Sequence, residues 1–289
     1  MQLVDNNICE IKIANSTADC YSTEMGRRRR RAHEQLNLLN KAGTKKRDPR
    51  GGKRPGAGRK PNNGVRAGMP HDVRSSLVVS HPQHVTLRVL PIVSTLRDFD
   101  IYPAFEKATI AAAKFGQNMD DDQWFRIVHL SIQTNHIHLL VEASDRDALS
   151  RGMQSFEISA AKWINRAVSK RFKRRRRGGV FADRYHDEPI KSPLQARRAL
   201  TYVLNNWRKH ERDRTVTSSK WRVDPFSSGV LFTGWQELAE RGLLRWNIPD
   251  GYVPLTVLEP RTWLLRVGWR RHGLVRCTEL PSERMFAHA

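Results

Sequence analysis

The strongest constraint on the fold is the order in which two hydrophobic periodicities alternate along the middle of the chain. Four runs have the alternating or β-branched pattern of strands: 84–90, 125–132, 135–142 and 180–190. Three runs have apolar residues at helical spacing: 103–115, 146–172 and 193–211. The resulting order, β-α-β-β-α-β and then one more helix, predicts a ferredoxin-like α+β fold with an antiparallel sheet and an added helix. That fold hosts many functions, so the function must be argued from specific residues.

Positive charge limits the class of partner. Lys and Arg number 51 against 29 Asp and Glu, so the formal net charge is +22. A field of that sign gathers polyanions, and nucleic acid is the commonest polyanion in the cytoplasm. Ribosomal, RNA-binding and anionic-lipid-binding proteins share this property. Charge therefore predicts a nucleic-acid partner without predicting a reaction.

Several protein classes are disfavoured by what the sequence lacks. No apolar run approaches the roughly 18 residues that span a bilayer, and no secretory signal is readable, so we expect no membrane association. The three scattered cysteines fit neither a disulfide framework nor a zinc site. We therefore expect a cytoplasmic protein, located at the bacterial nucleoid if it binds DNA. Because no nucleotide-binding loop is present, we expect no nucleotide cofactor.

Residues 1–80 are predicted to form a disordered basic arm. From about 27 to 80 the sequence is rich in Gly, Pro, Lys and Arg and poor in large apolar residues, so it cannot bury enough surface to offset its ordering entropy. Within it, residues 54–61 resemble an AT-hook core, which lies in a minor groove; a solvated basic linker is the alternative. Residues 1–24 differ in composition from the rest of the arm, and one hypothesis is that translation begins at Met25.

Two histidines in the run 135–142 form a candidate metal site. In a strand successive side chains alternate between faces, so His136 and His138 share one face and Ile137 lies on the other. Two imidazoles in this arrangement can bind one metal ion, although a polar strand face that happens to carry two histidines is the alternative. If a two-residue turn at 133–134 joins the strands, His129 lies opposite His138, where it could support a ligand or contact a phosphate.

The helix predicted from residue 193 carries a second pair of functional side chains. At about 100° per residue, Tyr202 and Asn206 lie roughly 40° apart on one face. Tyr202 is therefore not where a core-filling tyrosine is expected, and the carbonyl oxygen of Asn206 suits a hard cation such as Mg²⁺ or Mn²⁺. The apolar residues that would pack against the sheet lie further round the helix: Ala196, Leu200, Val203 and Trp207.

These motifs resemble the HUH single-tyrosine transposases, specifically the REP-associated tyrosine transposase group of insertion-sequence-200-like enzymes. The matching segments are 135–141, 180–186 and 199–206, within a resemblance that spans about 81–229. The resemblance implies that Tyr202 is the nucleophile, that the substrate is single-stranded or hairpin DNA, and that a divalent metal, Mg²⁺ or Mn²⁺, is bound. The implied metal ligands are His136, His138 and Asn206. The family often has Asn-Pro after the tyrosine, whereas Trp207 follows Asn206 here, which indicates a divergent branch with its own target site.

The implied reaction suits these residue types. A free tyrosine has a pKa near 10 and is a poor nucleophile at neutral pH, whereas a metal on the scissile phosphate would neutralise oxygen charge there. Attack by Tyr202 would give a 5′-phosphotyrosine, and the reverse attack would rejoin the DNA without ATP. Tyr185, which follows Arg184, is the rival nucleophile, but the family match favours Tyr202.

Basic residues outside this site are predicted to bind DNA. The run 170–177 is a candidate grip on the phosphate backbone. The extension 216–289, beyond a catalytic domain at 81–215, contains a short basic helix in which Trp269 is a candidate for stacking on bases; packing onto the catalytic domain is the alternative, for Trp263 above all. The predicted DNA contacts are Arg174, Arg175, Arg176, Arg177, Arg184, Arg266 and Arg270.

Two other functions and two oligomeric states stay open. A replication initiator or relaxase of the same superfamily is usually longer or carries a helicase or a second tyrosine. A non-catalytic nucleic-acid-binding protein could keep the scaffold and lose the activity. The sequence does not choose between a monomer and a homodimer.

Overall fold

The computed structural model describes residues 74, 76–91, 95–119, 122–209, 223–241 and 251–281. All of them belong to one compact unit that begins at Asn63. Most of the arm predicted at 1–80, with Met25 and the segment 54–61, lies outside these ranges. None of the described helices has the length and apolar character that crossing a bilayer requires.

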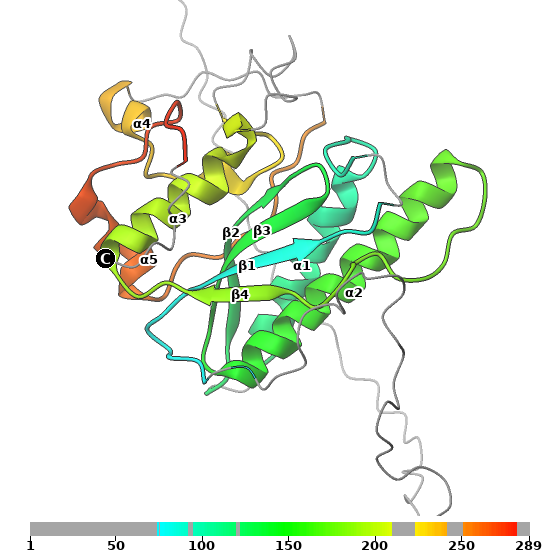
Figure 1. Ribbon diagram of the computed structural model, residues 1–289, viewed down its shortest axis with the longest axis horizontal. Coiled ribbons are helices and arrows are strands. Elements are labelled where there is room, and N and C mark those ends of the chain that lie inside the picture. Colours follow the sequence, from blue (N-terminus) through cyan, green and yellow to red (C-terminus); the bar gives the residue numbers. More distant parts are fainter. Residues whose placement is uncertain are drawn as a thin grey trace, which may run out of the picture. The chain divides into compact units, whose positions relative to one another are not determined.

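A four-stranded antiparallel sheet in the order β2-β3-β1-β4 forms the centre of the unit. Along the chain the order is β-α-β-β-α-β and then α3, which confirms the predicted ferredoxin-like fold with an added helix (Figure 1). The main elements are β1 (Gln83–Arg88), α1 (Tyr102–Gln117), β2 (Phe125–Ile132), β3 (His136–Ala143), α2 (Arg146–Arg171), β4 (His186–Pro189) and α3 (Pro193–Asn205). Short helices come after them: η1 (Asn206–Lys209), η4 (Ser228–Leu231), α4 (Gln236–Arg241), α5 (Trp263–Arg266) and η5 (Gly268–His272).

Helices α2 and α3 each begin after a residue whose side chain caps the helix. The Asp145 carboxylate accepts a hydrogen bond from the backbone N–H of Ala148 and so caps α2. Ser192 caps α3 in the same way, and the following proline has a φ suited to the first turn. The fourth strand is shorter than the predicted 180–190, because its first part makes only an isolated bridge through Phe181.

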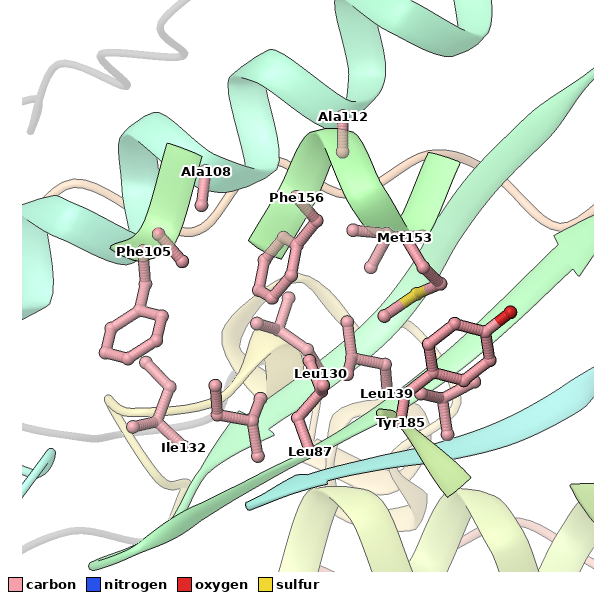
Figure 2. Close-up of a cluster of buried hydrophobic side chains, with 14 of the residues drawn as sticks. Leu87, Phe105, Ala108, Ala112, Leu130, Ile132, Leu139, Met153, Phe156 and Tyr185 are labelled. Carbon is pink, nitrogen blue, oxygen red and sulfur yellow. The ribbon is translucent and has the colours of Figure 1, made fainter. Parts of the chain in front are cut away.

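Helices cover both faces of the sheet, and each face has its own core. Helices α1 and α2 pack on one face, where Leu87, Leu130 and Leu139 meet Phe105 and Phe156 (Figure 2). Helix α3 and the C-terminal segments pack on the other face through a second buried cluster. Because strand side chains alternate, this arrangement decides which residues of each strand can face α3.

Buried and half-buried charged side chains hold the C-terminal segments against the rest of the fold. The fully buried Glu142 of β3 accepts hydrogen bonds from the backbone N–H groups of Arg261 and Thr262 and from the Thr262 hydroxyl, and so holds the start of α5. Arg97 makes a bidentate ion pair with Asp224, at 2.8 and 2.9 Å. These contacts make residues of 223–241 and 251–281 part of the packed structure around the α3 face.

Candidate active site

The α3 face of the sheet carries a row of histidines on adjacent strands. His136 and His138 of β3 point to this face, because Ile137 between them is buried in the opposite core. The register pairs His138 with Thr86 of β1, and His84 lies two residues further along β1 on the same face. This brings together residues that are about 50 positions apart in the sequence.

His138 is held by a second imidazole that the sequence motifs did not indicate. The Nε2 atom of His84 lies 3.2 Å from Nδ1 of His138, and the two rings are stacked with centroids 5.1 Å apart. The hydroxyl of Thr86 lies 3.2 Å from the same Nδ1 atom. Both imidazoles are buried, with 5% and 4% of their surfaces exposed. In β1 the side chain of His84 points to the face of the sheet opposite to that of Val85 and Leu87. Only the register between β1 and β3 shows that His84 meets His138.

The hydrogen bonds around the histidine pair involve Nδ1 of His136 and Nδ1 of His138. Burial, and then the charge of His186, lower the pKa of His84 to about 3, so this imidazole is neutral at physiological pH. Nδ1 of His138 can donate one proton to His84 Nε2 or to the Thr86 hydroxyl, or can accept one from either group. Likewise Nδ1 of His136 lies 2.8 Å from the side-chain oxygen of Asn135, which can only accept. In the tautomer with a proton on Nδ1, Nε2 is the ring atom that could bind a metal.

Tyr202 lies against this cluster. Its ring centroid is 5.0 Å from that of His138 and 5.7 Å from that of His84, in both cases edge to face. The side chain is half-buried, and burial raises the pKa of its phenol. The ammonium group of Lys209 lies 5.4 Å from the ring centroid and supplies a positive charge on this side of the helix. The core face of α3 is as predicted, since Ala196, Leu200, Val203 and Trp207 are all buried.

The two asparagines after Tyr202 have different surroundings. Asn205 donates through Nδ2 to the carbonyl oxygens of Arg276 and Glu279, so its side chain holds the C-terminal segment. Asn206 follows the last α-helical residue but keeps helical backbone angles, φ −57° and ψ −32°. It therefore lies one turn beyond Tyr202 on the same side of the helix. Asn206 is 2% exposed.

The donor set suits a hard or borderline divalent cation. Within the described ranges, no three His, Cys, Asp or Glu side chains lie close enough to form a metal site by themselves. A site here would combine the two imidazole nitrogens of His136 and His138 with an amide oxygen from Asn206. Nitrogen and oxygen ligands of this kind are compatible with Mg²⁺ or Mn²⁺, which usually keep water in the remaining positions.

The predicted pairing of His129 with His138 is wrong. The turn between β2 and β3 is centred on 134–135, because the backbone N–H of Gln133 bonds to the carbonyl oxygen of His136. The register therefore pairs Ser131 with His138, and His129 lies opposite Leu140. His129 is on the same face but contacts the hydroxyl of Ser228, 3.1 Å from its Nδ1 atom.

Tyr185 is on the other side of the sheet from Tyr202. Its ring is buried in the core under α2, and its hydroxyl lies 3.3 Å from that of Ser150 (Figure 2). The Arg74 guanidinium lies 3.8 Å above the ring. The described histidines near Tyr202 lie on the face of the sheet away from Tyr185. Tyr185 is therefore not part of the same site.

The basic residues predicted to contact DNA fall into two regions. Arg174, Arg175, Arg177 and Arg184 are exposed, whereas Arg176 is half-buried and fastens its loop to Ser169 and Gly179. The loop after α2 lies at the far side of Figure 1 from α3. Arg266 and Arg270 are exposed near the C-terminus.

The roles expected for the two C-terminal tryptophans are reversed. Trp269 is 2% exposed and packs against Phe232, with ring centroids 5.5 Å apart, so it cannot offer an open stacking surface. Trp263 is 48% exposed. The predicted single helix is broken at Val267, where φ is −135°, and this break changes which side chains face the core.

Comparison with known proteins bears on the central part of the chain. Residues 105–206 match the family model described as "Transposase IS200 like". Over these residues the resemblance to the IS200-like transposases is confirmed. The IS200-like segment begins in α1 and ends at Asn206, so it contains His136, His138 and Tyr202.

Several chains of solved structures are similar to this chain. One of them is a REP-associated tyrosine transposase bound to a REP hairpin, with 16% sequence identity and a TM-score of 0.40. The alignment covers 67% of this chain and 99% of that one. No curated protein sequence matches the chain.

Proposed function

We propose that this protein is a metal-dependent transposase of single-stranded DNA that cleaves and rejoins strands through a phosphotyrosine at Tyr202. The observation that supports this most directly is the position of the Tyr202 ring, 5.0 Å from the ring of His138. A phenol beside a pair of imidazoles is the constellation that tyrosine-based strand transfer needs. The IS200-like segment contains all of these residues.

His136, His138 and Asn206 would hold the divalent cation, Mg²⁺ or Mn²⁺. When bound, such a cation neutralises charge on a phosphate oxygen and orients the ester. Burial keeps the His84 imidazole neutral, so it adds no positive charge that would repel a cation. Its contact with His138 fixes the ring orientation that a ligand requires.

Tyr202 would attack the scissile phosphorus in line. The bond from its phenolic oxygen to phosphorus forms while the bond from phosphorus to the 3′ oxygen breaks, which leaves a free 3′-hydroxyl. The phenolic proton must leave during attack, because burial raises the pKa of Tyr202 and keeps the free phenol protonated at neutral pH. The positive charge of Lys209 favours the phenolate. Attack by a 3′-hydroxyl on the phosphotyrosine reverses the step and joins strands.

A protein–DNA adduct tests this proposal. Single-stranded and hairpin oligonucleotides labelled at the 3′ end would be incubated with the full chain and Mn²⁺, Mg²⁺ or a chelator, then separated on denaturing gels. We expect a labelled adduct that needs a metal and is absent in Tyr202→Phe. Tyr185→Phe is the matched control and should keep the adduct.

Two results would contradict the proposal. An adduct that persists in Tyr202→Phe would assign the nucleophile elsewhere. Binding without an adduct, on oligonucleotides that bind tightly and with each metal, would leave only the alternative of a non-catalytic nucleic-acid-binding protein.

A further inference from the structure

A pocket with a volume of about 420 Å³ opens beside the edge strand β2, and the proposed reaction does not use it. Its wall is formed by residues of β2, by segments 231–233 and 257–260, and by α5 and η5. The volume falls within the range of roughly 300–1,000 Å³ that is typical of small-molecule sites. The pocket contains two of the predicted DNA-contacting residues, Arg266 and Arg270.

A bulge in β2 brings Val128 to the same face of the sheet as His129, beside this pocket. The ladder with β3 shifts between Ile127 and His129, so Val128 is an extra residue on the bulged strand. Val128 and His129 therefore both face the α3 side and both line the pocket. Bulges commonly re-aim side chains next to functional sites.

The polar groups of the pocket are few and differ in charge. The Ser228 hydroxyl engages Nδ1 of His129, which leaves Nε2 to meet a ligand. Burial lowers the pKa of His129 to about 4, so at neutral pH the ring offers a neutral hydrogen-bonding nitrogen. Arg266, Arg270 and Glu259 are exposed side chains at the opening.

Two largely buried aromatic side chains form the apolar wall behind the site. Phe232 packs edge to face against His129, with ring centroids 5.3 Å apart, and Trp269 packs behind Phe232. Both aromatic residues line the pocket. An apolar wall, a neutral hydrogen-bonding group and two guanidinium groups at the opening match the three parts of a nucleotide: base, base edge and phosphate.

We propose that this pocket binds one unpaired base of the DNA strand, with a neighbouring phosphate held by Arg266 and Arg270. This rests on the proposed function, in that the ligand is the single-stranded DNA that Tyr202 would cleave. The Glu259 carboxylate can accept from an exocyclic amine, which favours adenine, cytosine or guanine over thymine. The pocket and the histidine cluster lie on one face of the sheet, since Ser131, two residues from His129, pairs with His138.

Oligonucleotides with an abasic site at each position in turn test the proposal. Binding of the full chain would be measured by fluorescence anisotropy without metal. We expect one position at which loss of the base weakens wild-type binding about ten-fold, which corresponds to about 1.4 kcal/mol of lost contacts. Thymine at that position should bind more weakly than cytosine or adenine.

Variants of the pocket should remove this position dependence. Thr233→Trp adds bulk at an exposed position of the wall and should flatten the abasic profile without disturbing the fold. His129→Gln tests the hydrogen-bonding group, with circular dichroism as a check on folding because His129 is buried. Arg271→Ala is the matched control: Arg271 is exposed beside Trp263 and outside the pocket, so its loss should weaken all oligonucleotides alike.

A flat wild-type profile, or an unchanged profile in Thr233→Trp, would overturn the pocket proposal. Either result is separate from failure of the proposed function, which is judged by the adduct on intact oligonucleotides. A protein that forms the adduct with a flat profile cleaves DNA without using this pocket. A protein with a position-dependent binding profile and no adduct binds a base in this pocket without cleaving the DNA.

Discussion

Nε2 of His84 lies 3.2 Å from Nδ1 of His138, so a histidine of β1 sets the orientation of a histidine of β3. Both rings are buried, and the two strands are adjacent in the sheet. His138 is one ligand of the proposed metal site. Removal of a residue that orients such a ligand usually lowers the affinity for the metal.

We predict that His84→Ala weakens Mn²⁺ binding about ten-fold to a hundred-fold. The reason is that Nδ1 of His138 loses its contact with the His84 ring, while the contact with the Thr86 hydroxyl stays. Isothermal titration calorimetry measures the affinity, and ¹⁵N NMR reports the tautomer of His138 directly. His84→Gln keeps a hydrogen-bond acceptor and should recover part of the affinity. Equal affinity in His84→Ala and the wild type would remove His84 from the metal site.

Substitutions of the two adjacent asparagines should affect different properties, namely cleavage for Asn206 and stability for Asn205. Asn206→Ala is expected to abolish metal-dependent cleavage with little change in stability. Asn205→Ala removes two hydrogen bonds to backbone carbonyl oxygens and should lower the free energy of unfolding by about 1–3 kcal/mol. Urea denaturation and the adduct assay separate these effects. Loss of cleavage in Asn205→Ala at unchanged stability would mean that the roles are exchanged.

We predict that Glu142 contributes strongly to the free energy of unfolding, although it lies outside the candidate active site. Its carboxylate accepts three hydrogen bonds from residues at the start of α5, all in a buried place. Glu142→Ala leaves those donors unsatisfied and should cost about 3 kcal/mol of unfolding free energy. The exposed Glu259 is the control, since Glu259→Gln should change it by less than about 0.5 kcal/mol. Similar denaturation midpoints for the two variants would refute the anchoring role.

Stability should fall as the solution is acidified from about pH 6.5 to pH 4. His129 has a pKa of about 4 in the folded protein, against an ordinary value of 6.5, because burial disfavours its charged form. Between these values the unfolded chain binds more protons than the folded one, so stability rises with pH across this window. The contribution of this one group reaches about 3 kcal/mol. Urea denaturation of wild type and His129→Gln at several pH values checks it: the variant should show the smaller pH slope, and equal slopes would disprove the assignment.

The salt dependence of DNA binding should report on the loop after α2. Arg174 is exposed in this loop, and if it contacts a phosphate, Arg174→Ala should reduce the slope of log affinity against log salt by about 0.7 for single-stranded DNA. Lys114→Ala, which removes an exposed charge from α1, should leave the slope unchanged. Anisotropy titrations between low and physiological salt measure both. Identical slopes for the wild type and Arg174→Ala would exclude that contact.

Local periodicity was sufficient to predict the order of the elements and the faces of the key side chains. Alternation in the 135–142 run placed His136 and His138 together, and helical spacing placed Tyr202 apart from the core face of α3. These properties depend on the backbone geometry of one element at a time, which the spacing of residues along the chain determines directly.

Only the tertiary structure decided which elements meet. The turn at 134–135 placed His129 opposite Leu140 instead of His138, and the bulge turned Val128 toward the α3 face; neither is visible in a periodicity. The register of β1 supplied His84, and the break at Val267 exchanged the surroundings of the two tryptophans. Pairings between distant segments depend on turns, bulges and packing that act together, so no single stretch of sequence determines them.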